Sequence, residues 1–324
     1  MHTEKPRAEG TVAAARTCAC RVAFLSVFVA CTLPSWLLAC VTDLPLWAPR
    51  TVEGHRRRAR FLARLTWAMW RLVFRLCFWL PLRMRGAAAL AERGGRGSRS
   101  VCLCANHVSY LDTPLLCVLA PWRLVADLKA LMSGVYLKLP ILGRLARAIG
   151  HIPIPYTSRQ FADFTMDKEE MARIMVQIDT HVRAGGHLCC FPEGTLNRSW
   201  EKLRQFRAGG FEICIRHDME IWGLIVTGCA DTWPEGVVLG GGPATLEFKT
   251  FLIAESAKEL AERLAGADAD LQQQGRAVAA EAQVAMQRVL DEMLASRAPA
   301  RPVDADPSAS LAQGDRGLRA RSSL

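Results

Sequence analysis

His107 and Asp112 are the pair of side chains in this 324-residue sequence best suited to proton transfer. On one continuous helix, two residues five apart would lie about 140° apart and could not meet. However, Val101–Ala105 is an apolar run typical of a buried strand, and Pro114 is typical of the first turn of a helix. We therefore expect His107 in the connecting turn and Asp112 at or just inside the helix. A carboxylate there can fix one imidazole nitrogen and raise the basicity of the other, as a general base requires.

A second cluster follows another apolar run and offers groups that suit an anionic ligand. It reads Phe-Pro-Glu-Gly-Thr over residues 191–195, and Arg198 and Lys202 come shortly after it. Glycine permits close approach of the backbone to a ligand, and nearby cations can hold a phosphate. Taken alone, the same residues fit a strand that ends in a tight turn equally well.

Together the two clusters resemble the glycerolipid acyltransferases, especially the 1-acylglycerol-3-phosphate (lysophosphatidic acid) acyltransferases. The N-H-x-x-x-x-D block of that family is matched by Asn106, His107 and Asp112, and its F-P-E-G-T block by residues 191–195. Leu203–Phe211 is similar to the basic Phe-Lys-x-Gly stretch that follows in the family, and Ile221–Thr227 occupies the place of its fourth, apolar block. The resemblance covers roughly residues 100–250.

The resemblance implies an O-acyltransferase of phospholipid biosynthesis. The acyl donor would be acyl-CoA or an acyl-carrier protein, and the acceptor a lysophospholipid, in the first place lysophosphatidic acid, which would become phosphatidic acid. His107 would be the catalytic base and Asp112 would orient it. Because a thioester is already activated, the resemblance implies no cofactor, metal or covalent intermediate.

The resemblance also implies a set of substrate-binding residues: Asn106, Arg159, Glu193, Gly194, Thr195 and Arg198. Two of these positions depart from the family pattern. Leu196 stands where the family usually has an arginine, and Arg198 comes two residues later. In the second block, the arginine after Gly150 is reached only at Arg159. Both shifts concern the phosphate of the acceptor, so glycerol 3-phosphate, lysophosphatidylcholine or another lysophospholipid stays open as the acceptor.

Two readings from other classes compete with acyl transfer to a lipid. A non-catalytic membrane scaffold could have the same fold, although both blocks are intact here. A hydrolase could use Ser109 or a cysteine beside His107, but the sequence contains no G-x-S-x-G nucleophile elbow. The products separate the three, since a hydrolase yields free fatty acid, a transferase yields a two-chain lipid and a scaffold yields neither.

The elements that must position these residues alternate between short apolar runs and helical stretches. This order predicts an α/β sandwich with a central, largely buried mixed sheet flanked by helices. The expected strands are 101–105, 123–126, 151–154, 187–191, 221–227 and 245–249. The expected helices are 113–119, 143–149, 161–183 and 206–217, followed by a helical region over 255–296 with breaks near Gly266 and Gly275.

The N-terminal third carries the positive charge of the chain and its longest apolar run. Residues 1–100 contain 17 Lys and Arg against 5 Asp and Glu, whereas the whole chain has a net charge of +10. Residues 22–42 contain no charge and are long enough to span a bilayer, with Pro34 allowing a kinked span or a re-entrant hairpin. A signal peptide ending near Cys40 is the competing reading. We expect a retained transmembrane or re-entrant segment after an N-terminal tail of residues 1–21.

Residues 56–85 place aromatic side chains and arginines on different sides of one helix. This pattern predicts an amphipathic helix at the membrane interface, and a core-facing surface helix is the alternative. Ten basic residues between Asp43 and Arg85, against four before the apolar run, place the catalytic domain in the cytosol by the positive-inside rule. The membrane would be the endoplasmic reticulum in a eukaryote or the inner membrane in a bacterium. The expected partners are the bilayer, the lysophospholipid and acyl-CoA, with no nucleic acid.

Composition and spacing bound the remaining parts of the chain. Hydrophobic residues make up 51% and charged residues 22%, which excludes a disordered or fibrous protein, and there are too few apolar runs for a polytopic transporter. The expected acyltransferase domain with its helical extension covers residues 98–296, and residues 297–324 form a polar tail expected to be disordered. The twelve cysteines show no C-x-x-C spacing, so the sequence predicts no structural zinc site.

Overall fold

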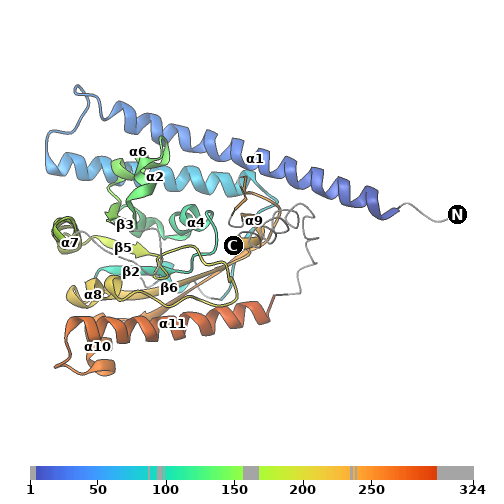
Figure 1. Ribbon diagram of the computed structural model, residues 1–324. Helices are drawn as coiled ribbons and strands as arrows, with labels where there is room; N and C mark the ends of the chain where they lie inside the picture. Colours follow the sequence, from blue (N-terminus) through green and yellow to red (C-terminus); the bar gives the residue numbers. More distant parts are fainter. Residues whose placement is uncertain are drawn as a thin grey trace, which may run out of the picture.

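The chain folds into a seven-stranded mixed sheet with helices on both faces (Figure 1). The computed structural model describes residues 5–86, 88–92, 97, 99–155, 168–233, 236–237 and 239–297. The predicted α/β sandwich with an N-terminal apolar helix is confirmed. Arg159 and residues 298–324 lie outside the described residues, as do the predicted helix start at 161–167 and most of the glycine-rich segment 94–98.

The strands lie in the order β1-β7-β6-β2-β5-β3-β4. All neighbouring pairs are parallel except β6 and β7, which are antiparallel. The central strand β2 is buried along its whole length, which explains why its sequence is a continuous apolar run instead of an alternating one. The strands are β1 (Leu82–Met84), β2 (Val101–Ala105), β3 (Leu128–Ser133), β4 (Ile152–Ile154), β5 (His187–Cys190), β6 (Glu220–Thr227) and β7 (Leu246–Ala254).

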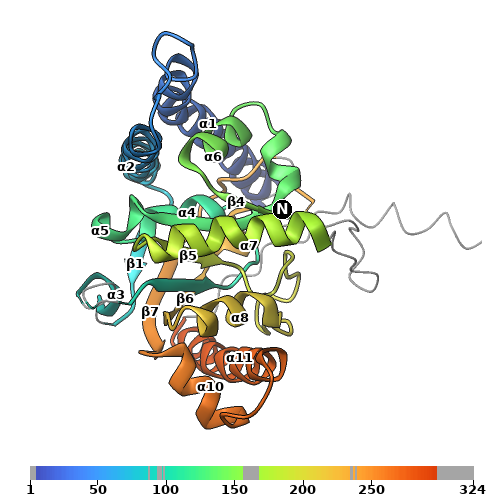
Figure 2. The same cartoon turned by 90° about the vertical axis from the view of Figure 1, so that its left-hand side faces the viewer.

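Helices cover the two faces of the sheet as separate layers, which Figures 1 and 2 show from two sides. One face packs against α7 (Lys168–Arg183), α8 (Ala208–Arg216), α10 (Ala257–Ala265) and α11 (Leu271–Ala295). The other packs against α1 (Lys5–Val41), α2 (Val52–Leu76), α3 (Ala89–Glu92), α4 (Asp112–Leu119) and α5 (Trp122–Val125). The remaining helices are α6 (Leu142–Ile149), α9 (Cys229–Thr232) and the 3-10 helix η1 (Gly134–Lys138).

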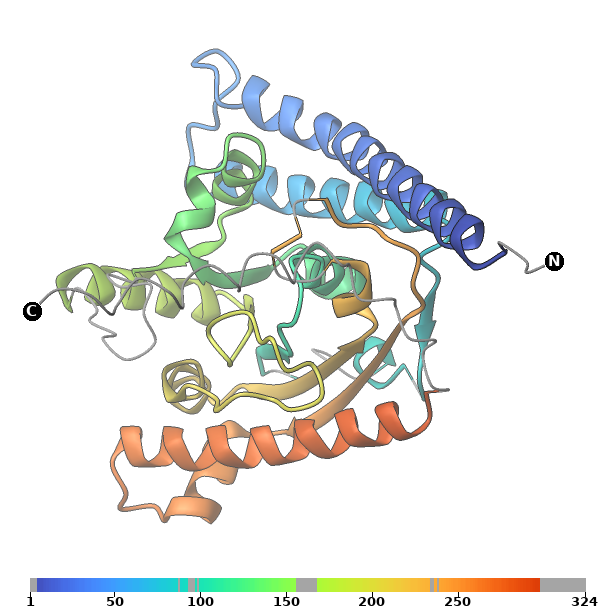
Figure 3. The same ribbon diagram turned by 45° about the vertical axis from the view of Figure 1, so that its right-hand side comes forward.

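The N-terminal helix α1 runs without a break through Pro34 and lies beside α2 (Figure 3). Among the described residues, its Val12–Val41 portion is the one helical segment long and apolar enough to cross a membrane, by length and composition. Of the most apolar 18-residue stretch of this portion, 28% is buried inside the protein. Phe24 packs edge-on against Trp233, so α1 also contacts the segment that follows the end of β6.

The aromatic face of α2 packs onto the protein. Trp70 is buried and its indole N–H donates to Thr32 Oγ1 of α1 at 3.0 Å, while the Trp67 indole donates to the Ala120 carbonyl at 2.9 Å. On the same helix, the Arg60 guanidinium pairs with Asp127 at 2.8 Å. The aromatic residues therefore take the core-facing position that the sequence leaves open as the alternative to an interfacial one. Phe61, Leu76 and Phe78 are among the large apolar side chains of this region that stay exposed.

Three predicted elements differ from those observed. The expected strand over 123–126 is the short helix α5, because Pro121 supplies an N-terminal proline and the strand begins only at Leu128. The expected helix over 56–85 ends at Leu76, and its last part forms the edge strand β1 beside β7. Gly275 does not break α11. A side chain there would place its Cβ 2.6 Å from Glu212 Cγ, so glycine permits the close approach of α8 and α11.

A buried lysine in strand β3 predicts a particular pH dependence of stability. Lys129 in β3 donates to the Ile149 carbonyl oxygen, and burial lowers its pKa to about 8 from a usual 10.5. Between these values the unfolded chain holds a proton that the folded chain has lost, so stability rises with pH. We expect the free energy of unfolding to rise by up to about 3 kcal/mol more between pH 8 and 10.5 in the wild type than in Lys129→Met. The free energy of unfolding would be measured by denaturant titration at several pH values across this range. If it changed equally with pH in both proteins, the lowered pKa of Lys129 would be contradicted.

Candidate active site

The two sequence blocks meet at the carboxyl ends of the parallel strands β2 and β5. Asn106 and His107 directly follow β2, and Phe191 directly follows β5, whose Cys190 is paired in register with Cys104. Ligands of α/β sheets bind at such carboxyl ends, where loops from neighbouring strands converge. The Phe191 ring stacks on the His107 imidazole with ring centres 4.0 Å apart and planes 12° apart.

His107 and Asp112 contact each other across the turn between β2 and α4. His107 Nδ1 lies 3.2 Å from Asp112 Oδ2, and the same oxygen accepts the backbone N–H groups of Val108 at 2.6 Å and Ser109 at 2.7 Å. An ionised carboxylate only accepts, so this contact favours the tautomer with its proton on Nδ1. Nε2 is then the basic nitrogen. The predicted placement of Asp112 at the helix start holds, because α4 begins at that residue.

The Asp112 carboxylate is buried, with a side chain 2% exposed, and the His107 side chain is 11% exposed. Behind the aspartate lies the fully buried thiol of Cys229, whose pKa is raised by burial and then by the negative charge of Asp112. The pair therefore has a shielded acid end and an imidazole that reaches the surface. That geometry suits transfer of a proton between His107 and a bound ligand.

The Ser109 hydroxyl is used for hydrogen bonds that hold the turn. It is fully buried, its hydroxyl donates to the Trp233 carbonyl at 2.7 Å, and its oxygen accepts the Leu111 N–H at 3.1 Å. These two bonds fix the loop that carries Asp112. They also speak against Ser109 as the nucleophile of a hydrolase.

Glu193 connects the two blocks from the inside. Its side chain is fully buried, and Oε1 accepts the backbone N–H of His107 at 2.9 Å. Oε2 accepts the Asn197 side-chain amide at 2.7 Å and the Arg204 backbone N–H at 2.9 Å. Burial raises the pKa of Glu193, and these hydrogen bonds oppose that rise. The structure thus places Glu193 behind His107 as a positioning group.

Asn106 has a similar inward-facing place. Its amide donates to the Val226 carbonyl at 2.9 Å and accepts the Val226 N–H at 2.8 Å, so it joins the end of β2 to β6. Asn197 completes the connection by donating its backbone N–H to the His107 carbonyl at 2.6 Å. The sequence did not indicate that Asn197 bonds to both Glu193 and His107, although its position four residues after Glu193 was a usable signal.

The loop that follows Glu193 brings arginines close to the ends of the strands. Gly194 has a φ of 75°, and an added Cβ would clash with the Arg207 side chain, so both the backbone and the packing require glycine. Thr195 accepts from Arg204 Nη1 at 3.0 Å. Arg204 and Arg207 belong to the basic stretch that resembles Phe-Lys-x-Gly. The sequence alone did not indicate that their side chains contact Thr195 and Gly194. Arg198 lies on the same loop, whereas Arg159 falls outside the described residues.

Comparison with known proteins agrees with this geometry. The model of the Acyltransferase family matches residues 83–227, a range that contains both blocks. Residues 83–227 are therefore similar to the Acyltransferase family, which confirms the predicted resemblance to the glycerolipid acyltransferases. No curated protein matches the sequence.

The fold is similar to the crystal structure of the 1-acyl-sn-glycerophosphate (LPA) acyltransferase PlsC from Thermotoga maritima. The two chains are 15% identical and superpose with a TM-score of 0.61, covering 88% of this chain and 100% of PlsC. At this identity the likeness concerns the fold. The mixed sheet and its flanking helices are thus arranged as in PlsC.

Proposed function

We propose that this protein transfers a fatty acyl group from acyl-CoA to the free hydroxyl of lysophosphatidic acid, which yields phosphatidic acid. The observation that carries the proposal is the His107–Asp112 pair, held at the carboxyl end of β2 within an acyltransferase domain. Two further features support it. The Phe-Pro-Glu-Gly-Thr block adjoins the same imidazole, and the similar fold of PlsC belongs to an LPA acyltransferase.

In the proposed reaction, His107 Nε2 removes the proton from the acceptor hydroxyl while that oxygen attacks the thioester carbonyl carbon. The carbon–sulfur bond then breaks, and the CoA sulfur takes the proton back from His107. Asp112 holds the imidazole by Nδ1 and stabilises its charged form. Proton transfer by a positioned base contributes about 100- to 10,000-fold to such a rate, and the fixed orientation of two substrates contributes more.

The acceptor phosphate needs cations near His107. Arg204 and Arg207 lie against the Gly194–Thr195 turn, and Arg198 is on the same loop. Arginine binds phosphate oxygens through paired N–H groups, so these three are the candidates on the described part of the chain. Arg159 keeps the place that the resemblance gives it as a fourth candidate.

Attachment to a membrane surface fits the proposed substrates. Lysophosphatidic acid and a long acyl chain both partition into a bilayer, so an enzyme anchored there meets them at high local concentration. The apolar segment Val12–Val41 can supply the anchor by its length and composition. We propose that the acyltransferase domain faces the cytosol, in line with the arginine-rich segment after α1.

An acceptor panel tests the substrate. Membranes containing the protein should release CoA thiol from oleoyl-CoA when lysophosphatidic acid is added, and not with lysophosphatidylcholine or glycerol 3-phosphate. Membranes lacking the protein give the background rate. Release with a different acceptor would keep the chemistry and overturn the acceptor. Silence with all three acceptors, and with an acyl-carrier-protein donor, would favour the scaffold reading.

A further inference from the structure

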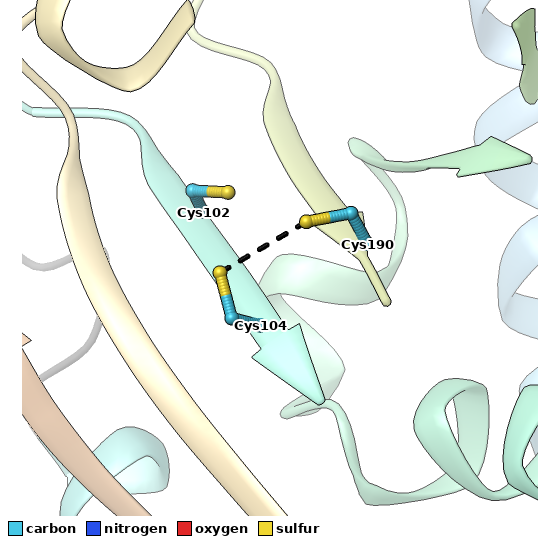
Figure 4. Close-up of side chains that lie close together, drawn as sticks. All are labelled: Cys102, Cys104 and Cys190. Atoms are coloured by element: carbon cyan, nitrogen blue, oxygen red, sulfur yellow. Dashed lines mark hydrogen bonds between the residues drawn. The ribbon is translucent and has the colours of Figure 1, made fainter. Parts of the chain in front are cut away.

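A cluster of three cysteines lies on the face of the sheet that packs against α7 and α8, whereas α4, which begins at Asp112, covers the other face. Cys102 and Cys104 alternate on β2 and so share one face of the sheet, and register places Cys190 of β5 directly opposite Cys104. The three sulfur atoms lie within 4.8 Å of one another and point toward a common centre (Figure 4). Local spacing in the sequence does not reveal this cluster, because it is formed by the pairing of strands that are far apart in the chain.

The spacing of the sulfurs fits a bridging ion better than a disulfide. Cys104 Sγ and Cys190 Sγ are 3.9 Å apart. Two thiolates bound at about 2.3 Å to a tetrahedral zinc ion stand about 3.8 Å apart, whereas a disulfide requires about 2.05 Å. The two strands already hold the sulfurs at the separation of two ligands on one ion.

The start of α8 lies against the cluster and would stabilise thiolates on an ion bound there. A Cβ added to Gly210 would lie only 3.7 Å from Cys190 Sγ, so the first turn of α8 approaches this sulfur with no side chain between them. The positive end of a helix stabilises a thiolate. Cys214 donates its own thiol to the Gly210 carbonyl at 3.2 Å and lies beside the cluster.

We propose that Cys102, Cys104 and Cys190 form a binding site for one soft divalent metal ion of the zinc and cadmium class. Thiolates select such ions over magnesium or calcium. Binding replaces three thiol protons with one ion, so three protons leave, no electron moves, and one net negative charge faces the start of α8. Cys190 is partly exposed and provides the route of entry. The site is independent of the proposed acyl transfer, although Cys190 directly precedes Phe191, which stacks on His107.

Cadmium is a suitable probe because its thiolate complexes absorb in the ultraviolet. The purified full-length chain, with Cys18→Ser and Cys20→Ser to remove two accessible thiols of α1, should bind one Cd²⁺ and show this charge-transfer absorbance. Cys104→Ala and Cys190→Ser should each lower the affinity by roughly 10- to 100-fold. Cys117→Ala, which alters a cysteine of the other core, is the matched control and should leave the affinity unchanged.

Protection from alkylation supplies a measurement that needs no cluster variant. Bound Cd²⁺ should slow the labelling of Cys190 by iodoacetamide, read by mass spectrometry of the peptide, in a chain whose circular dichroism is unchanged. The proposal is overturned if Cd²⁺ leaves that labelling rate unchanged, or if folded Cys104→Ala and Cys190→Ser bind Cd²⁺ as tightly as the parent chain.

Discussion

Replacing His107 with alanine is expected to lower the rate of acyl transfer by about 100- to 10,000-fold, the contribution of a positioned general base. The substitution removes the imidazole that Asp112 holds by Nδ1, and no other described side chain occupies that place. The fold should survive. His107 contributes its backbone N–H to Glu193 and its carbonyl to Asn197, and alanine keeps both groups.

His217 offers a matched control for this experiment. It forms a second histidine–aspartate contact, with Nε2 2.8 Å from Asp179 Oδ1, but on the helical layer away from the strand ends. His217→Ala should therefore keep most of the activity. The rates of thiol release should be compared in membranes with equal amounts of each protein. Substantial activity in His107→Ala, or equal losses in the two variants, would show that His107 is not the base.

Replacing Glu193 with glutamine is expected to damage both stability and activity. The carboxylate accepts three N–H groups in a fully buried place, and the amide nitrogen of glutamine can accept none. At least one of those donors would then face another donor, at a cost of about 1–3 kcal/mol for the buried group left unpaired. The melting temperature should fall by several degrees. Activity should fall further than stability alone explains, because Glu193 connects the His107 backbone to the second block.

Glu201→Gln is the matched control, since it makes the same chemical change at an exposed position on the neighbouring loop. It should alter neither the melting temperature nor the rate. Thermal unfolding and thiol release would be measured on all three proteins. If Glu193→Gln melted and reacted like the wild type, the buried carboxylate could not be what holds the two blocks together.

The sequence predicted best what is local or what depends on a continuous apolar run. The meeting of His107 with Asp112 followed from the strand end at Ala105 and the helix start marked by Pro114, and the structure has both. The strands β2, β5 and β6 lie within a residue of their predicted positions. Most of their residues are buried, which leaves little ambiguity, because apolar side chains suit strands that are covered on both faces.

What the sequence could not predict depends on contacts between distant segments. From the sequence, Glu193 is expected to bind the substrate. Only the folded chain shows that its carboxylate points inward and accepts the His107 backbone N–H. The aromatic face of α2 could equally suit a membrane or a protein core, and only the folded chain shows Trp70 buried against α1. Cys190 joins the other two cysteines through strand order, which has no signature in local spacing.

The central claim is that His107 is the base for transfer of an acyl group from a thioester to a lipid hydroxyl, and the lipid product tests this claim most directly. Purified wild-type protein and His107→Ala would be incubated with oleoyl-CoA and lysophosphatidic acid, and the lipids analysed by mass spectrometry. We predict phosphatidic acid carrying the oleoyl chain from the wild type, in amounts equal to the thiol released, and none above background from the variant. Free oleic acid as the main product, or phosphatidic acid in equal amounts from both proteins, would contradict the claim.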